Sequence, residues 1–266
     1  VDSVARAYEK MGALAIGEDI YIIVQRDGQS RQFTAKVAAM PEDVPANLPA
    51  AENNPKEGKS KFETGAIEIR LPEFKNKCIT YIPENYDPDR KYGVVIYLPE
   101  PGQADTQEIL APWMEACAER DLILLAPQSR DSQEWRIDEV EFIHRTLRKL
   151  AATYNLDGSR IAIYGNGVGG VMAAVYFHSG MSKANGLVVI NRLMPSFVTP
   201  RPLVPAKRSA IYWACNPNDA ARRDRQLDVL RAAKYPVTIR DLNAAGPLPA
   251  DEQAELIRWI DSLDRF

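Results

Sequence analysis

The chain has 266 residues, of which 45% are hydrophobic and 26% are charged, and its formal net charge at pH 7 is −3. This balance is typical of a globular protein and lacks the basic surface on which nucleic-acid binding depends. The longest apolar runs are the length of a strand, far below the ~20 residues of a membrane-spanning helix, so we expect no membrane span.

The cysteines and histidines form no metal-binding or disulfide pattern. The chain has three cysteines, none of them in a C-x-x-C arrangement, and two histidines. We therefore predict no metal site, no disulfide framework and no cofactor. Because the chain begins at Val1 rather than at a methionine, we interpret it as a piece of a longer protein.

Residues 1–40 form the first predicted unit. Apolar residues at helical spacing predict an amphipathic helix over residues 3–14, with Asp2 or Ser3 as its N-cap. Two β-rich runs follow on either side of Asp27-Gly28, a dipeptide typical of a tight hairpin turn. A helix followed by a hairpin is therefore expected.

Residues 41–60 are predicted to be a linker. The segment contains four prolines and many charged residues, which favour a chain that is part extended and part flexible. The linker separates the small N-terminal unit from a large domain over residues 61–266.

The large domain alternates buried-type strands with helices. Two paired strands are predicted near its start, in "GAIEIRLPEF" and "NKCITYIP". Further strands are expected at the apolar runs 92–98, 121–127, 160–165, 186–191, 209–215 and 236–242, and helices at 106–119, 138–153, 168–179 and 251–263. Continuous apolar strands separated by helices indicate a mostly parallel sheet covered on both faces. We therefore predict a doubly wound α/β fold.

The stretch "RIAIYGNGVGG", residues 160–170, carries the functional argument. Its strand, glycine-rich turn and helix match the layout of G-x-S-x-G, the nucleophile elbow, which presents a serine at the top of an α/β sheet. Gly167 stands where that serine belongs. Glycine tolerates positive φ angles, so the turn can persist without its nucleophile.

Residues 62–266 resemble the α/β-hydrolases, in particular the esterase, feruloyl esterase and polyhydroxybutyrate-depolymerase-like branch. "YIPENYDPDRKYGVVIYLPEPG" is similar to that branch's entry into the third strand, and "DEVEFIHRTLRKLAATYNLDGSRIAIYGNGVGG" is similar to the segment that leads to the elbow. The resemblance implies a nucleophile, a histidine base, an orienting acid and an oxyanion hole, each of which can be sought in this sequence.

The histidine base has no candidate. The resemblance places it after the last strand, but no histidine follows His178, and we interpret His178 and His144 as structural residues on helices.

The acid has a candidate in Asp219, with Asp224 as a second choice. Without a histidine to orient, we interpret Asp219 as a loop or helix N-cap residue.

The oxyanion turn is altered as well. The resemblance implies a His-Gly pair after the third strand, and Pro99 and Glu100 replace it. A carboxylate near a developing negative charge opposes catalysis.

We considered Cys215 as a replacement nucleophile, but no histidine adjoins it in the sequence. A carboxylate cluster of Glu100, Asp138 and Asp219 and a dinucleotide site at the glycines are further weak alternatives.

The first 40 residues resemble the C-terminal half of a PDZ domain of the HtrA-type, trypsin-like proteases. "VDSVARAYEKMGALAIGEDIYIIVQRDGQSRQFTAKV" is similar to its second helix and last two strands. The resemblance implies a parent serine protease, an upstream protease and PDZ segment as partner, and a periplasmic or secreted location. Because the peptide-binding edge of a PDZ domain is absent, we expect this piece to bind C-terminal peptides poorly.

We therefore predict a pseudo-hydrolase, a domain of this fold that binds or scaffolds and is not itself an enzyme. Its former cleft is expected to be a polar site for a peptide, protein or carbohydrate, with Trp135 beside it and a proline-stiffened rim over residues 194–208. The predicted ligand-binding residues are Glu100, Asn166, Asn216 and Asp219. An active esterase or peptidase with a rearranged catalytic site remains the alternative.

Overall fold

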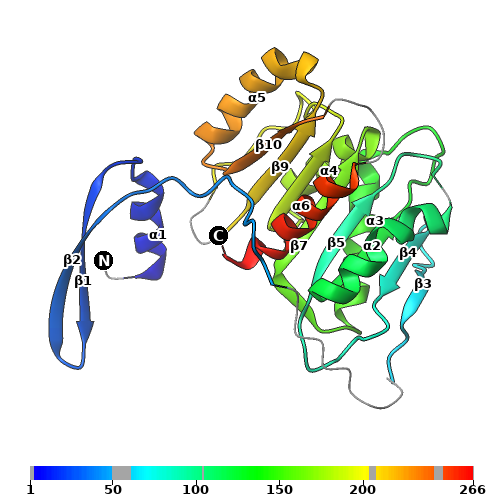
Figure 1. The fold of residues 1–266 in the computed structure, drawn as a ribbon, viewed down its shortest axis with the longest axis horizontal. Helices are drawn as coiled ribbons and strands as arrows, with labels where there is room; N and C mark the ends of the chain where they lie inside the picture. The colour runs from blue at the N-terminus through cyan, green and yellow to red at the C-terminus, as the bar shows by residue number, and fades with distance from the viewer. Residues whose placement is uncertain (1–2, 50–60, 104, 204–207, 243–247, 266) are drawn as a thin grey trace.

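The computed structural model describes residues 3–49, 61–103, 105–203, 208–242 and 248–265. A small N-terminal unit stands beside a larger body built around one sheet (Figure 1). Among the described residues, no helix is both long enough and apolar enough to cross a membrane.

The N-terminal unit is the predicted helix followed by a hairpin. Helix α1 (Val4–Ala13) precedes the antiparallel strands β1 (Asp19–Arg26) and β2 (Gln29–Lys36). Ser3 is the N-cap, because its hydroxyl accepts a hydrogen bond from the Arg6 N–H at 3.3 Å. Asp27 and Gly28 both have positive φ angles, 52° and 75°, which gives the hairpin a turn that matches the twist of its strands. This prediction is confirmed.

The large body holds a mixed, mostly parallel sheet of eight strands. In space their order is β10-β9-β8-β7-β5-β6-β4-β3, with β4 antiparallel to both β3 and β6 and the other pairs parallel. The strands are β3 (Gly65–Ile69), β4 (Cys78–Ile82), β5 (Tyr92–Leu98), β6 (Leu122–Pro127), β7 (Leu156–Asn166), β8 (Gly186–Ile190), β9 (Ala210–Cys215) and β10 (Val237–Asp241). The predicted doubly wound α/β fold is confirmed.

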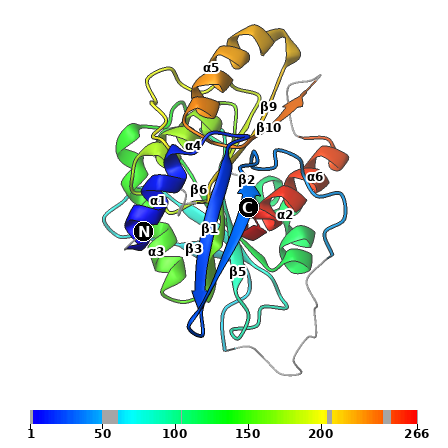
Figure 2. The same cartoon turned by 90° about the vertical axis from the view of Figure 1, so that its left-hand side faces the viewer.

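Helices cover both faces of the sheet (Figures 1 and 2). They are α2 (Thr106–Arg120), α3 (Val140–Ala151), α4 (Val168–His178), α5 (Ala220–Ala232) and α6 (Ala250–Asp261). One hydrophobic cluster joins α3, α4 and α5 to the sheet, and a second joins α2 and α6 to the opposite face. Neighbouring residues of one strand enter different clusters, Val94 the first and Val95 the second, as the alternation of side chains along a strand requires.

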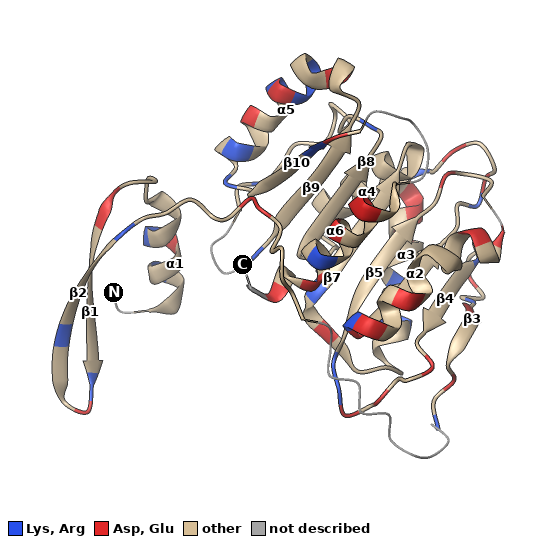
Figure 3. Cartoon of the chain, in the orientation of Figure 1, with Lys and Arg blue, Asp and Glu red and all other residues tan. Residues whose placement is uncertain are grey.

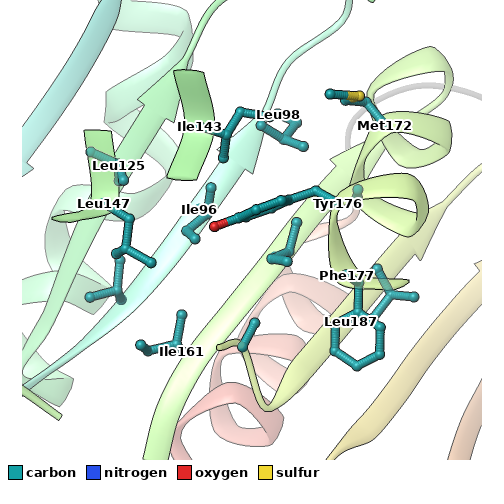
Figure 4. Packing of buried hydrophobic residues seen from close by; sticks show 14 of the residues in the cluster. Ile96, Leu98, Leu125, Ile143, Leu147, Ile161, Met172, Tyr176, Phe177 and Leu187 are labelled. Atoms are coloured by element: carbon teal, nitrogen blue, oxygen red, sulfur yellow. The ribbon is translucent and has the colours of Figure 1, made fainter. Parts of the chain in front are cut away.

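The centre of the first cluster lies between α4 and α3. Figure 4 shows Tyr176 of α4 among Ile96 of β5 and Ile143 and Leu147 of α3. The Tyr176 side chain is fully buried, and its hydroxyl lies 3.5 Å from Nδ1 of His144. This packing fixes α4, whose first residue forms part of the candidate site.

Helix α5 was not predicted from the sequence. Its segment "AARRDRQLDVLRA" is dominated by charged residues, and its buried side chains are only Leu227, Leu230 and Arg223. Because so narrow a face is buried, the apolar periodicity that normally marks an amphipathic helix is weak. Figure 3 shows the charged residues spread along α5.

The described part of the predicted linker packs along the large body. Glu42 forms an ion pair with Arg231 at 2.8 Å, and its carbonyl oxygen accepts from the Thr238 hydroxyl at 2.5 Å. Further along, Leu48 is buried and its carbonyl oxygen accepts from Arg120 at 2.7 Å. Residues 50–60 lie outside the described residues, and the division into domains stays a prediction.

Arg160 joins four elements at the edge where the parallel strands begin. Its guanidinium donates to Asp157 at 2.9 Å and to Asp261 at the end of α6 at 2.7 Å. It also donates to the carbonyl oxygens of Arg120, at the end of α2, and Lys91, before β5, at 3.1 and 3.2 Å. Arg160 is only 9% exposed. These four acceptors therefore satisfy the N–H groups of a guanidinium that has little contact with water in the folded protein.

We predict that Arg160→Met lowers the free energy of unfolding by about 2–3 kcal/mol. It removes a donor that the half-buried carboxylates of Asp157 and Asp261 share, and it leaves the carbonyl oxygens of Arg120 and Lys91 without that donor. Arg145→Met is the matched control. Arg145 also bonds two carboxylates, those of Glu73 and Glu141, but all three side chains are exposed, so the loss should stay below ~1 kcal/mol. Urea denaturation of both variants measures the difference, and equal losses would contradict the assignment.

Candidate functional site

The turn between β7 and α4 has the tight geometry expected of an elbow. Gly167 adopts φ 53° and ψ −118°, a conformation strained for any residue with a side chain. Two neighbouring glycines allow the close approach of helix and strand. A Cβ atom at Gly165 would lie 2.3 Å from the Gly169 carbonyl oxygen, and one at Gly169 would lie 2.0 Å from the Leu98 carbonyl oxygen. The backbone at this turn therefore has little freedom to change.

The turn lies at the point where the direction of strand connection reverses. From β5 the chain crosses to β6 on one side and then returns to β7 on the other. In open α/β sheets, ligands bind outside the carboxyl ends of the strands at such a point. Glu100, just after β5, and Gly167, just after β7, meet there.

The Glu100 carboxylate occupies the space above Gly167. A Cβ atom built on Gly167 would lie only 1.7 Å from Oε1 of Glu100. The same oxygen accepts a hydrogen bond from the Val168 N–H at 3.1 Å. Val168 is the first residue of α4, and the partial positive charge of a helix N-terminus stabilises a carboxylate in this position.

Polar groups flank this contact on both sides. Asn166 precedes Gly167, and its side-chain oxygen accepts from the Asn191 amide at 3.0 Å. Trp135 donates its indole N–H to the Pro99 carbonyl oxygen at 2.9 Å, which places it beside the Glu100 turn. The structure therefore brings Glu100 and Asn166 together at Gly167, with Trp135 next to the Glu100 turn.

The loop that carries Trp135 is held by a buried carboxylate. Glu139 is 2% exposed and accepts from the backbone N–H groups of Arg130 and Arg136, both at 2.6 Å. The Asn76 amide donates to it as well, at 2.5 Å. Three donors satisfy the buried charge, so Glu139 fixes the loop.

Asn216 and Asp219 belong to the turn that starts α5. Asn216 accepts from the Asn218 N–H at 2.9 Å and has the extended backbone of a cap residue. Asp219 stands at the N-cap position of α5, but its side chain makes no capping hydrogen bond and instead lies 3.6 Å from the Arg222 guanidinium. Asp219 thus lies at the N-cap position of α5 without a capping bond, and Asn216 caps the 3-10 turn (Pro217–Asp219) that precedes the helix.

A cavity of about 800 Å³ lies between α4, α5 and the loop after β8. Asn191 lines it and joins it to the elbow through the bond to Asn166. Of the predicted ligand-binding residues, Asp219 lines the cavity. Sequence reasoning missed its arginines, whose signal is the run "RRDR" at residues 222–225.

No family profile matches the sequence, and no curated protein matches it. Solved structures do resemble the chain. Thermogutta terrifontis esterase 2 phosphonylated by cyclosarin aligns with a TM-score of 0.54 and 14% identity over 73% of this chain and 91% of that chain. The Francisella virulence factor BioJ aligns with a TM-score of 0.55 and 10% identity, over 74% of this chain and 84% of that chain. S-formylglutathione hydrolase (FrmB) from Staphylococcus aureus aligns with a TM-score of 0.53 and 11% identity, over 74% of this chain and 96% of that chain.

The fold is that of the α/β-hydrolases. The resemblance read from the sequence is thus confirmed for the fold. At 10–14% identity, the likeness says nothing about which residues of this chain act. The chemistry of the site has to be judged from its own side chains.

In an α/β-hydrolase elbow, the residue at the turn supplies the nucleophile and the next backbone N–H helps to bind the oxyanion. In this chain, the turn residue is Gly167, which has no side chain, and the next N–H is that of Val168, which Glu100 already occupies. A substrate oxygen that develops negative charge would have to displace a carboxylate.

The other candidate nucleophile, Cys215, is buried at the end of β9. Burial raises the pKa of its thiol, although the nearby Arg223 guanidinium acts in the opposite direction. A protonated, buried thiol is a poor nucleophile. This environment gives Cys215 a structural role.

The two histidines lie away from the elbow. His178 is at the far end of α4, about 15 Å from its first residue at 1.5 Å per residue, and its ring packs edge-on against Phe177 and Tyr235. His144 is on α3, and burial lowers its pKa. Within the described ranges, no group of three or more His, Cys, Asp or Glu side chains is arranged to hold a metal ion.

We predict that the cost of Gly167→Ala depends on Glu100. In the natural background, the new methyl group strains the turn and also displaces the Glu100 carboxylate from Val168. In a Glu100→Ala background, only the strain remains, so the loss in unfolding free energy should be smaller by about 1 kcal/mol. Urea denaturation of the two single variants and the double variant measures this coupling.

Gly158→Ala is the matched control for that cycle, because a Cβ atom there meets nothing within 4 Å. It should show no coupling to Glu100→Ala. If Gly167→Ala costs the same in both backgrounds, Glu100 does not occupy the space above the turn.

Proposed function

We propose that the large domain is a pseudo-hydrolase that binds or scaffolds and does not catalyse a reaction. The observation that carries the proposal is the Glu100 carboxylate, which fills the place of the nucleophile's side chain and takes the Val168 N–H. The sequence adds support, since no histidine follows His178 to serve as the base. Losing one oxyanion donor already costs about 10²–10³ in rate.

The surroundings of the contact suit a polar ligand. Asn166, Asn191 and Trp135 offer amide groups and an aromatic surface beside the filled turn. Such groups recognise peptides, protein segments or carbohydrates by hydrogen bonding and stacking. We propose a ligand of one of these classes for the former cleft, and no nucleic acid.

The N-terminal unit supports a role inside a larger assembly. Several of its apolar side chains are exposed, among them Tyr21 at 70% and Ile23 at 66%, and a helix with a two-stranded hairpin rarely folds alone. We propose that it is the C-terminal half of a PDZ-like domain, completed by an upstream segment of a trypsin-like protease. A periplasmic or secreted location belongs to the same proposal.

A second candidate function is an active hydrolase with a rearranged site. It is favoured by the solved structures that the chain resembles, which include an esterase and an S-formylglutathione hydrolase. The best-placed group for such chemistry is Glu100, whose carboxylate lies where a nucleophile would stand. This candidate predicts ester turnover that is lost in Glu100→Gln.

The test combines a fluorophosphonate probe, read by intact mass, with hydrolysis of a short-chain nitrophenyl ester. We expect no adduct and no turnover above buffer for the natural protein. Gly167→Ser combined with Glu100→Ala, which supplies a hydroxyl and the room for it, should also stay inactive because the base is missing.

Each contrary outcome has its own meaning. A stoichiometric adduct on the natural protein would overturn the proposed function, and peptide mapping would name the nucleophile. Turnover without an adduct that disappears in Glu100→Gln would instead support the second candidate.

A further inference from the structure

The cavity beside the elbow has charged and apolar parts. Its charged lining consists of Arg192, Arg222 and Arg225 together with the single carboxylate of Asp219. The chain as a whole has a net charge of −3, so this excess of positive charge is local. All three arginines line the cavity and are exposed.

The rest of the lining is largely apolar. Leu193 and Phe197 contribute from the loop after β8, and Val229 and Leu230 contribute from α5. Phe197 is 65% exposed and Val229 is 53% exposed, values that are high for side chains of this kind. A ligand that covered them would remove apolar surface from water.

The position of the arginines follows from the helix. Arg222, Gln226 and Val229 are spaced three to four residues apart, so they share one face of α5. Arg225 lines the same cavity, whereas Arg223 turns toward the sheet and pairs with Asp241. The cavity therefore receives two of the three arginines in this run.

The opposite wall is fixed to α5. Gln226 accepts from the Met194 N–H at 3.2 Å and donates to the Met194 carbonyl oxygen at 2.9 Å. Trp213, buried in β9, donates its indole N–H to the Arg192 carbonyl oxygen at 2.8 Å. These bonds hold both walls in place before any ligand arrives, which lowers the entropy lost on binding.

We propose that this cavity binds a small amphipathic organic anion, with its acid group at the arginines and its apolar body against Phe197 and Val229. Guanidinium groups form paired hydrogen bonds with carboxylates, sulfonates or phosphates. The volume of about 800 Å³ is within the range of small-molecule sites. Neither Gly167 nor Glu100 lines the cavity, so the site is separate from the filled elbow.

The experiment measures binding of octanoate, as a dissolved monomer, by isothermal titration calorimetry with the full chain. Octanamide is the neutral partner of the same shape. We expect octanoate to bind and octanamide to bind at least tenfold more weakly. Arg222→Gln and Arg225→Gln should each weaken octanoate binding about tenfold, and Phe197→Ser should weaken it as well.

Arg148→Gln is the matched control, because it removes one exposed arginine from α3, away from the cavity lining. It should leave octanoate affinity unchanged. Thermal melting of every variant establishes that the fold is intact. Equal binding of octanoate and octanamide, or unchanged affinity in both α5 variants, would overturn the proposal.

This inference goes beyond the proposed function, because it assigns a ligand class to a different site of the same domain. The two can fail separately. Ester turnover by the natural protein would overturn the proposed function whatever octanoate does. Absence of octanoate binding with no ester turnover would overturn only the inference about the cavity.

Discussion

The close contact between β7 and α4 is the constraint on which the candidate site depends. Gly165 and Gly169 allow the helix to approach the strand and the Leu98 carbonyl oxygen so closely that a methyl group at either position would overlap backbone atoms. This contact fixes the start of α4 at the carboxyl edge of the sheet. The first N–H of the helix is thereby presented to the turn after β5, where Glu100 meets it.

At that point the α/β-hydrolase fold of this chain has a carboxylate of its own at the helix N-terminus. A hydrolase directs the helix N-terminus at negative charge that appears during the reaction. Here the negative charge belongs to the protein itself, because Glu100 is bound there in the resting state. The Glu100 carboxylate accepts one of the N–H groups that a helix N-terminus leaves without an intrahelical partner, and the partial positive charge of the helix end stabilises it there.

The cavity is a consequence of how α5 meets the loop after β8. Gln226 ties α5 to that loop, and Trp213 ties the loop to β9. The helical spacing of α5 then brings Arg222 to the cavity, while Arg223 forms an ion pair with Asp241 of β10. A charged helix that buries little apolar surface thus contributes a basic wall beside the filled elbow. The two features share one edge of the sheet but draw on different residues.

The sequence by itself determined the strands, every long helix except α5, and the fold class. Apolar runs such as "YGVVIYL" and "RIAIYG" are too continuous for half-exposed strands, and the Asp27-Gly28 turn requires positive φ angles that few other pairs adopt. The sequence also determined that position 167 has no nucleophile and that no histidine follows the last strand. Only the tertiary structure decided where Glu100 lies and that two arginines of α5 line a cavity. Those facts depend on contacts between segments far apart in the chain, such as that between Glu100 and Val168, which lie 68 positions apart, and local patterns carry no record of such contacts.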